Sequence, residues 1–596
     1  MHRRVWFLAA AALVAVLALA SSAAAMRTTT SSRTVAKSSF ARQLAAVPRT
    51  PAARKAKKVV NFAMEQDAGG FNLANEDFTG AWAAYFGETP IIRGDYMITN
   101  TGGYQLDLAQ KVVATKHYLK IWIRKNADWH WVGHKPFPVT AADYIYTWHQ
   151  IVKPGNNVAS TTGYDQITKA KVAGKGKIVT FYWKTPFADY KDLFGYVYPS
   201  KALNGQSFNT FWSDCVCGYP DHKPISDGPY YLSSWTPGAG LILKASKWYG
   251  KKPAVTTIVG KLYTDEASEI NAMSAGEVDA IAPGQPITSM VSLLHKKGVK
   301  HSIVPGFTQE HVDVEFGAAG SGAGGTHTAN GAFLLKKSWF NQALAMGMNR
   351  QAVANAVYNG VLPAGSVKPL NNPFYILGPL ATSKAHQYFK PFNFNPKGAI
   401  KLLKKHGCTG GPSKPSNGNN NIWTCGGHKA EVNYYSTTAP ARCNIAMPAF
   451  LQQEKAIGIQ LDNKCYNAQP DFFTNLLPTG NFDLAEYAFT GSPDPSTWDA
   501  IYQCVGPTTG GQNYKNYCNK KVDALMKKGD KELNPTKRTA DYEAAAKLVS
   551  QNVAIIPLYA RPSFLFYNSK IKGMANGNNP TSEGPLWDAQ AWKWSS

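Results

Sequence analysis

The sequence predicts an α/β protein built from more than one domain. Short apolar runs alternate with helix-like stretches along most of the 596 residues, a pattern typical of strands and helices that pack in layers. In several places a helix-like stretch ends at a glycine and a short apolar run follows, as at Gly276, Gly298 and Gly458, because glycine favours helix ends. At roughly 150 residues per domain, the length corresponds to two to four domains.

The composition excludes two classes of protein. Hydrophobic residues make up 44% of the chain and charged residues 17%, so the chain can bury sizeable cores and is not disordered as a whole. Only one stretch is apolar enough to meet a membrane, and it lies at the extreme N-terminus. A channel or transporter with several membrane spans is therefore excluded.

Individual elements follow from local patterns. Residues 59–64 form an apolar run and are expected to be the opening strand. Residues 140–152 are expected to be a helix, because Thr140 and Asp143 have the spacing of a capping box and later apolar residues share one face. Further strands are expected at 118–124, 178–183, 278–281, 301–305, 460–463 and 554–559, and further helices at 265–275, 289–297, 339–358, 446–457 and 536–552.

The first 25 residues have the features of a secretory signal. Arg3 and Arg4 precede an apolar run, and small residues follow it up to Ala25, which is the three-part pattern of a signal peptide. The alternative is an N-terminal membrane anchor, although the run is shorter than the roughly 20 residues that span a bilayer. No cysteine lies near the cleavage site, so a lipid-anchored terminus is not encoded.

Residues 26–58 are expected to form a basic, disordered tether. They contain nine basic residues and no acidic one, and unopposed charge with few aromatic residues favours a solvated segment. The tether could be attracted to an anionic membrane or wall surface, at about 1 kcal/mol per basic residue, or could be a plain spacer. Nucleic-acid binding is not expected, because no basic and aromatic platform motif is present.

The eight cysteines lie in four local groups, and an exported chain is expected to oxidise them. Local pairing would close loops of roughly 15 to 20 residues in three of the four cases, each worth about 3 kcal/mol. Eight cysteines permit 105 pairings, so the local scheme is a hypothesis. It joins Cys215 to Cys217, Cys408 to Cys425, Cys443 to Cys465, and Cys504 to Cys518.

No motif of a catalytic or cofactor site has its required context. Residues 320–325 match G-x-G-x-x-G, but more polar loop follows where a dinucleotide site needs a helix. His130 and His134 have no third metal ligand nearby in the sequence, and no C-x-x-C pair exists, so neither a metal nor another cofactor is expected. A hydrolase with two carboxylates across a cleft stays open, because a sequence does not show such a pair.

Several short phrases stand in a fixed order between about residues 59 and 590. They are 138–143 (PVTAAD) with Tyr146 and Trp148, 228–230 (GPY) with Trp235 and 249–253 (YGKKP), 269–280 with Gly276 and Asp279, 340–344 (FNQAL) with Asn349 and Arg350, Phe482 and Asp483 with 493–495 (PDP), and 556–558 (IPL). In this order and spacing they resemble the extracellular solute-binding protein family 5, the receptors of peptide- and nickel-type ABC importers.

The resemblance implies a type II periplasmic-binding-protein-like fold, with two lobes and an additional small lobe. Lobe I would combine residues 59–95, 223–305 and 555–596, the small lobe would span 96–222, and lobe II would span 306–554. Two crossover segments, near 305–309 and 552–557, would act as hinges between the lobes.

The resemblance also implies a function without catalysis. Such a receptor captures a solute, here a peptide or peptide-like molecule, between two lobes and delivers it to the permease subunits of an ABC transporter. The protein would be exported, periplasmic or extracellular, and a monomer. Aromatic walls and one or two charged groups suit such a cleft. The residues implied at the ligand are Trp82, Tyr85, Phe307, Tyr435, Arg442, Phe489, Asp494, Trp498 and Tyr559.

One departure bears on the ligand. Gly491 stands where peptide-type members commonly carry an aspartate for the amino terminus of the peptide, so the resemblance does not extend to a free amine. Two other function classes stay open, a secreted hydrolase acting on glycans or peptides, and a wall-binding module that uses the basic tether.

Overall fold

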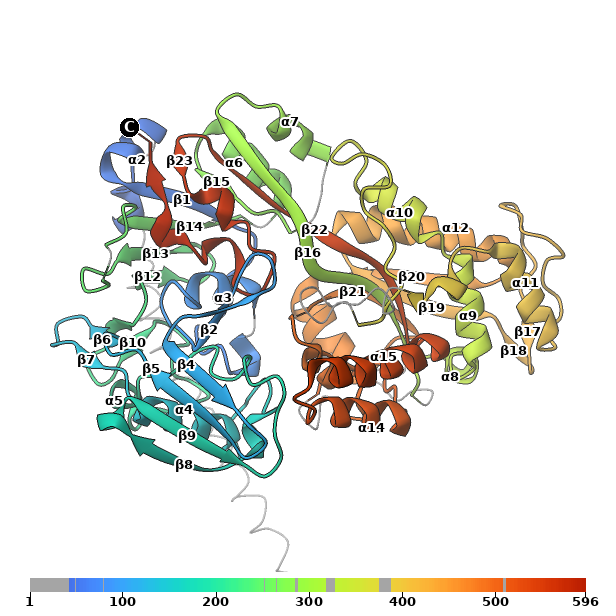
Figure 1. Ribbon diagram of the computed structural model, residues 1–596. Coiled ribbons are helices and arrows are strands. Elements are labelled where there is room, and N and C mark those ends of the chain that lie inside the picture. Colours follow the sequence, from blue (N-terminus) through green and yellow to red (C-terminus); the bar gives the residue numbers. More distant parts are fainter. Residues whose placement is uncertain are drawn as a thin grey trace, which may run out of the picture.

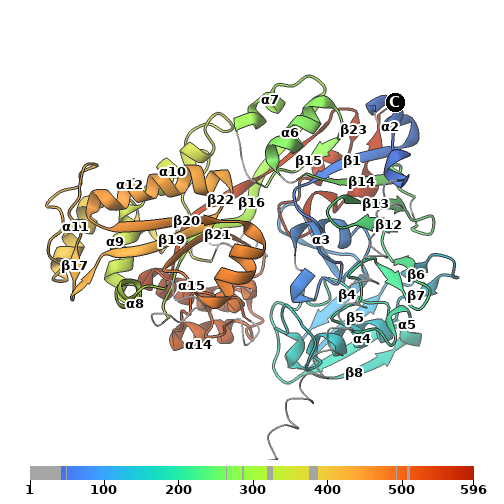
Figure 2. The same cartoon turned by 180° about the vertical axis from the view of Figure 1, so that it is seen from behind.

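A computed structural model describes residues 42–595, apart from 49, 79, 251, 264, 285–287, 318–326, 375–386, 492 and 507–510. The predicted signal peptide and the G-x-G-x-x-G match lie outside the described residues. The chain forms two lobes side by side, joined by the long strands β16 (Val299–Val314) and β22 (Ile555–Asn568), as Figures 1 and 2 show from opposite sides. The predicted α/β fold with two lobes and an additional small lobe is confirmed.

One mixed sheet runs through both lobes. Within the described residues its strand order is β12 (Tyr230–Thr236), β13 (Gly240–Ala245), β14 (Thr257–Leu262), β1 (Val59–Met64), β15 (Ala280–Ile281), β22, β16, β21 (Leu484–Thr490), β19 (Glu431–Thr437) and β20 (Gln460–Tyr466). Every residue of β1 is buried, as expected for a strand covered on both faces. The strands before β22 belong to lobe I and those after β16 to lobe II.

The crossover strands pair antiparallel along most of their length, from Val299 opposite Asn568 to Asp313 opposite Ile555. Their pairing is interrupted between Val304 and Thr308. A Cβ on Gly306 would lie 1.9 Å from the carbonyl oxygen of Arg561, so glycine permits the close approach of the two strands there. This interruption overlaps the segment 305–309 expected to act as the first hinge, and its role as a hinge stays a prediction. The second was expected at 552–557, but that segment pairs within lobe II, and the partner of the first hinge is about residues 561–563.

The small lobe contains a four-stranded sheet of β4 (Ala109–Ala114), β5 (Tyr118–Ile123), β9 (Ile178–Trp183) and β8 (Ile167–Ala173), with the hairpin β2 (Tyr96–Ile98) and β3 (Tyr104–Leu106). A second sheet joins β10 (Cys217–Gly218), β11 (Lys223–Ser226), β6 (Asp128–Trp131) and β7 (Phe137–Pro138). Helix α4 (Ala141–Val152) begins with the predicted capping box of Thr140 and Asp143.

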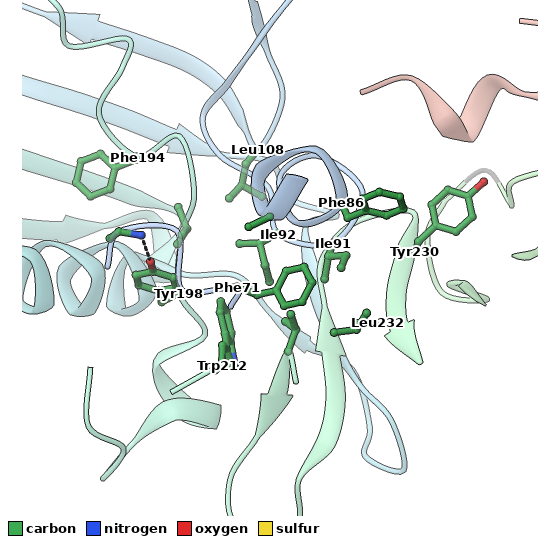
Figure 3. Packing of buried hydrophobic residues seen from close by; sticks show 14 of the residues in the cluster. Phe71, Phe86, Ile91, Ile92, Leu108, Phe194, Tyr198, Trp212, Tyr230 and Leu232 are labelled. Atoms are coloured by element: carbon green, nitrogen blue, oxygen red, sulfur yellow. Dashed lines mark hydrogen bonds between the residues drawn. The ribbon is translucent and has the colours of Figure 1, made fainter. Parts of the chain in front are cut away.

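The small lobe and lobe I share one hydrophobic core, so we expect them to move as one body. Figure 3 shows residues that contribute to it from the segment 71–108, from the small lobe at Phe194 and Tyr198, and from β12 at Tyr230 and Leu232. Lobe II has further buried clusters around β19–β21. The exact boundaries of the lobes stay predictions.

The helices of lobe I and the small lobe are α2 (Pro51–Lys57), α3 (Ala81–Gly87), α4, α5 (Ser200–Leu203), α6 (Glu266–Ala275) and α7 (Val291–Leu294). Those of lobe II are α8 (Ala329–Leu334), α9 (Ser338–Gly347), α10 (Arg350–Val357), α11 (Pro396–Lys405), α12 (Met447–Ile457), α13 (Asp499–Tyr502), α14 (Lys520–Gly529) and α15 (Pro535–Asn552). The helix expected at 339–358 is two helices, because the side chain of Asn349 accepts from the amide of Ala352 and caps a new helix that begins at Arg350. No described helix combines the length and apolar character needed to cross a membrane.

The tether predicted over 26–58 is wrong for its last part. Residues 51–57 form α2, and the side chain of Arg54 is fully buried. Its guanidinium binds both carboxylate oxygens of Asp279, at 2.6 and 2.8 Å. The sequence shows an unopposed basic run because the acidic partner lies more than 200 residues away. All four local disulfides of the hypothesis are present: Cys215–Cys217, Cys408–Cys425, Cys443–Cys465 and Cys504–Cys518.

Candidate functional site

A buried charge cluster lies where the crossover strands pass between the lobes. Glu310 on β16 has a side chain only 1% exposed, and it receives two arginines. Arg442, in the short helical turn Ala441–Ala446 of lobe II, contacts one of its oxygens at 2.6 Å, and Arg561 on β22 contacts the other at 2.6 Å. Burial disfavours the carboxylate, but the two guanidinium groups outweigh it and hold the pKa of Glu310 below its ordinary value.

The cluster continues into lobe I. Arg561 donates to the carbonyl oxygen of Gly284 at 3.5 Å, and the amide of Gly284 donates to Glu65 at 2.7 Å. Glu65 directly follows β1, at the carboxyl end of the strand, which is the edge where open α/β sheets bind ligands. Burial, together with the charge of Glu266, raises the pKa of Glu65 to about 7. Polar groups thus form a continuous path from Glu65 to Arg442 across the lobe boundary.

Two further groups complete the cluster on the side of lobe II. The hydroxyl of Tyr434 on β19 donates to Glu486 on β21. Burial, and then the charge of Glu310, raise the pKa of Glu486 to about 8, so this carboxyl is mostly protonated at pH 7. Burial thus disfavours the charged form of Glu486, while Glu310 is paired with two guanidinium groups.

Three of the residues implied by the family resemblance lie at this cluster. Arg442 is bound to Glu310 directly. Tyr559 is opposite Glu310 in the ladder of β16 and β22, and burial and the charge of Glu310 raise its pKa. Burial and the charge of Glu65 raise the pKa of Tyr85 to about 12, while the charge of Arg561 lowers it. Phe307 lies on the same crossover strand, where its carbonyl oxygen accepts from the amide of Gly491 at 3.1 Å.

The other aromatic residues of that set lie in packed surroundings. Trp82 is 4% exposed and packs edge-on against Phe62 in the core of lobe I. Trp498 is fully buried in lobe II. Tyr435 packs against Tyr466 with ring centroids 5.4 Å apart. These positions favour a packing role for the two tryptophans.

Phe489 covers a buried histidine. Its ring stacks on His311 of β16, with centroids 4.6 Å apart and planes 7° from parallel. Burial lowers the pKa of His311 to about 4, and the charges that act on it come from Asp313, Lys515 and Glu310. His311 is therefore neutral at physiological pH.

Asp494 lies in a second polar cluster, which joins the small lobe to lobe II. Arg538 of α15 contacts Asp494 at 3.1 Å and also pairs with Asp189 of the small lobe. The hydroxyl of Tyr104 on β3 donates to Asp192 and lies 3.2 Å from a carboxylate oxygen of Asp494. We call these five residues the inter-lobe clasp. Burial raises the pKa of Asp494 to about 6, although Lys191 and Tyr104 oppose the shift.

Backbone groups add to the clasp. The amide of Ser496 donates to Asp189 at 2.8 Å, and the amide of Ala188 donates to the carbonyl oxygen of Asp530 at 2.7 Å. Both contacts join the small lobe to lobe II, so the structure shows the lobes in contact at the end opposite the crossover strands. Asp494 contacts groups of both lobes, and its expected contact with the ligand stays a prediction.

Sequence reasoning missed Glu310, Arg561, Asp189 and Arg538. Their partners are between 44 and 349 residues away in the chain, and no local pattern marks such pairs. One signal in the sequence could have found a member of this set. An acidic residue inside an apolar strand next to a predicted hinge indicates Glu310, but none of the other three. Among the described residues, no group of three or more histidine, cysteine or acidic side chains could hold a metal ion.

Comparisons with known proteins agree with this architecture. The family described as bacterial extracellular solute-binding proteins, family 5 (middle), matches residues 103–512. Di/tripeptide-binding protein 3 of Pseudomonas aeruginosa is 23% identical over 342 residues, which are 57% of this chain and 56% of that protein. The chain thus spans a little over half the length of this relative.

Solved structures share the fold over most of the chain. The oligopeptide-binding protein AppA from Bacillus subtilis, in complex with a nonapeptide, has a TM-score of 0.73 at 16% identity and covers 90% of this chain and 99% of its own. NikZ from Campylobacter jejuni, in complex with Ni(L-His), has a TM-score of 0.73 at 18% identity with the same coverage. The family match extends over more than half of the sequence, and the chain therefore belongs to the bacterial extracellular solute-binding proteins of family 5.

Proposed function

We propose that this protein is the exported receptor of an ABC importer, which captures a peptide or peptide-like solute between its lobes and delivers it to a permease chemically unchanged. One observation carries the proposal: β16 and β22 run continuously from one lobe to the other, and the Glu310 cluster lies where they cross. Two strands of this kind allow the lobes to rotate about a narrow connection. The protein would act as a monomer in the periplasm or outside the cell.

The charge of the Glu310 cluster favours a ligand with a carboxylate. Arg442 and Arg561 both contact Glu310, and burial raises the pKa of the neighbouring Glu486, which disfavours its charged form. Guanidinium groups bind carboxylates through charge-assisted hydrogen bonds, so an anionic ligand group is compatible with this cluster. The carboxyl terminus of a peptide supplies such an anion, which agrees with the peptide named for the relative from Pseudomonas and for the Bacillus structure.

Binding of defined peptides tests the proposal. A pool of free-acid peptides is expected to raise the unfolding midpoint and to reduce the radius of gyration in small-angle X-ray scattering. The same peptides with amidated carboxyl termini should bind at least tenfold more weakly. Arg442→Gln should remove that preference, whereas Lys429→Gln, in an exposed pair with Glu431, should leave it intact.

Two results would contradict the proposal. Cleaved products of a bound peptide or glycan would identify the protein as a hydrolase. Retention at the cell surface that depends on residues 26–41, without binding of any solute, would favour the wall-binding module.

A further inference from the structure

Arg350 differs from the other buried arginines of the protein. Arg54, Arg442 and Arg538 each pair with at least one carboxylate. Arg350 is 2% exposed, and its guanidinium donates to four neutral oxygens, the carbonyls of Leu370 and Pro557 and the side-chain amides of Asn371 and Asn393. Its charge is therefore solvated by dipoles without a counterion.

No acid of the chain supplies that counterion. Every Asp and Glu side chain belongs to the described part of the structure, because the remaining segments contain none. Among those described acids, none forms an ion pair with Arg350, and burial alone lowers the pKa of its guanidinium, to about 9. A buried cation in this situation is costly, since desolvation is not offset by an opposite charge.

The guanidinium borders an open cavity of about 360 Å³ in lobe II. Among the described residues that line it, Lys368 is a second cation and none is acidic. The side-chain oxygens of Asn371 and Asn393 face Arg350, so the amino groups of these amides can donate to a ligand. Two cations and two amides around one cavity are the donors that an oxyanion requires.

We propose that this cavity binds a small oxyanion, of the carboxylate or phosphate class, against Arg350 and Lys368. The site is separate from the Glu310 cluster and does not depend on the solute bound between the lobes. It lies beside the hinge, because Arg350 also binds the carbonyl of Pro557 on β22, and Pro369 pairs with Tyr559 of the same strand. An anion there would hold the segment around Lys368 against the crossover strand.

The probe is inorganic phosphate, titrated against the whole protein without peptide, in a buffer that contains chloride at constant ionic strength. We expect a saturable rise in the unfolding midpoint and a measurable heat of binding. Sodium acetate is titrated in a second series, and a stronger response to acetate than to phosphate would show that the cavity prefers a carboxylate. Lys368→Gln should weaken phosphate binding at least threefold, whereas Lys336→Gln, an exposed lysine outside the cavity, should not.

Asn393→Asp is the decisive variant, because it places a carboxylate on Arg350 with almost no change in shape. It should raise the unfolding midpoint without phosphate and abolish the effect of phosphate. Asn359→Asp, at an exposed position just after α10, should do neither. The proposal is overturned if phosphate and acetate act no more strongly than chloride, or if Asn393→Asp leaves phosphate binding unchanged or lowers the midpoint.

Discussion

Arg538→Met tests whether the inter-lobe clasp stabilises the closed arrangement of the lobes. Arg538 contacts both Asp189 and Asp494, and the three side chains are 6%, 0% and 11% exposed. The variant removes this guanidinium from both carboxylates, which stay buried while the lobes are together. When the lobes separate, water reaches these carboxylates, so the cost falls on the closed state.

The expected size follows from that difference. Removing one partner of a buried ion pair costs about 3 to 5 kcal/mol. If about 3 kcal/mol of this cost opposes closure, the affinity for the solute falls on the order of 100-fold, since each 1.4 kcal/mol corresponds to a factor of ten. Asp189→Asn removes the charge but keeps an acceptor for the amide of Ser496. Because both residues belong to one ion pair, the double variant Arg538→Met with Asp189→Asn should lose less binding free energy than the sum of the two single variants.

The assay combines calorimetric titration of the bound peptide with small-angle scattering of the free and bound protein. Arg538→Met should weaken binding and increase the radius of gyration of the bound form. Lys528→Met removes the contact with Asp541 at 2.7 Å, which joins α14 and α15 within lobe II, and should change the affinity less than twofold. Equal affinity and equal scattering for Arg538→Met and the native protein would refute the reasoning.

Three further predictions concern stability. His311 binds its proton only near pH 4 in the folded state but near 6.5 when unfolded, so the free energy of unfolding falls as pH drops from 6.5 to 4, by up to about 3 kcal/mol from this group. In urea unfolding at several pH values, His311→Gln should lack this part of the loss. The same pH profile for the variant and the native protein would contradict the prediction. Arg54→Met should cost about 3 to 5 kcal/mol because it leaves a buried aspartate unpaired, while Lys55→Met should cost under about 0.5 kcal/mol, and equal midpoints would show that α2 is not docked. Replacing Cys408 and Cys425 together by serine removes a disulfide across a sequence separation of 17 and should lower the free energy of unfolding by roughly 3 kcal/mol. The same free energy of unfolding for the variant and the native protein would disprove this prediction.

The sequence predicted those helices and strands well whose signal comes from neighbouring residues. The strand 59–64 and the helix begun by Thr140 and Asp143 are present as expected, because periodicity and capping depend on neighbours in the chain. The four disulfides also followed from sequence neighbourhood. The helix 339–358 was too long because Asn349 caps a new helix inside an uninterrupted apolar pattern.

Contacts between distant segments were out of reach. Arg54 is part of a basic run in the sequence, yet it belongs to a buried ion pair with Asp279. Asp494 was expected to contact the ligand, which stays a prediction, and the sequence did not show that its partners Tyr104 and Arg538 come from opposite lobes. Hydrophobic and charged composition alone does not distinguish a residue that binds a solute from one that joins two lobes.

The measurement that tests the account most directly is a native mass spectrum of the protein purified from its own host, followed by the mass of the solute after release. The account predicts a one-to-one complex whose solute leaves with the mass at which it was bound. A protein that carries no solute under any growth condition, or one that releases fragments of what it bound, would contradict the account.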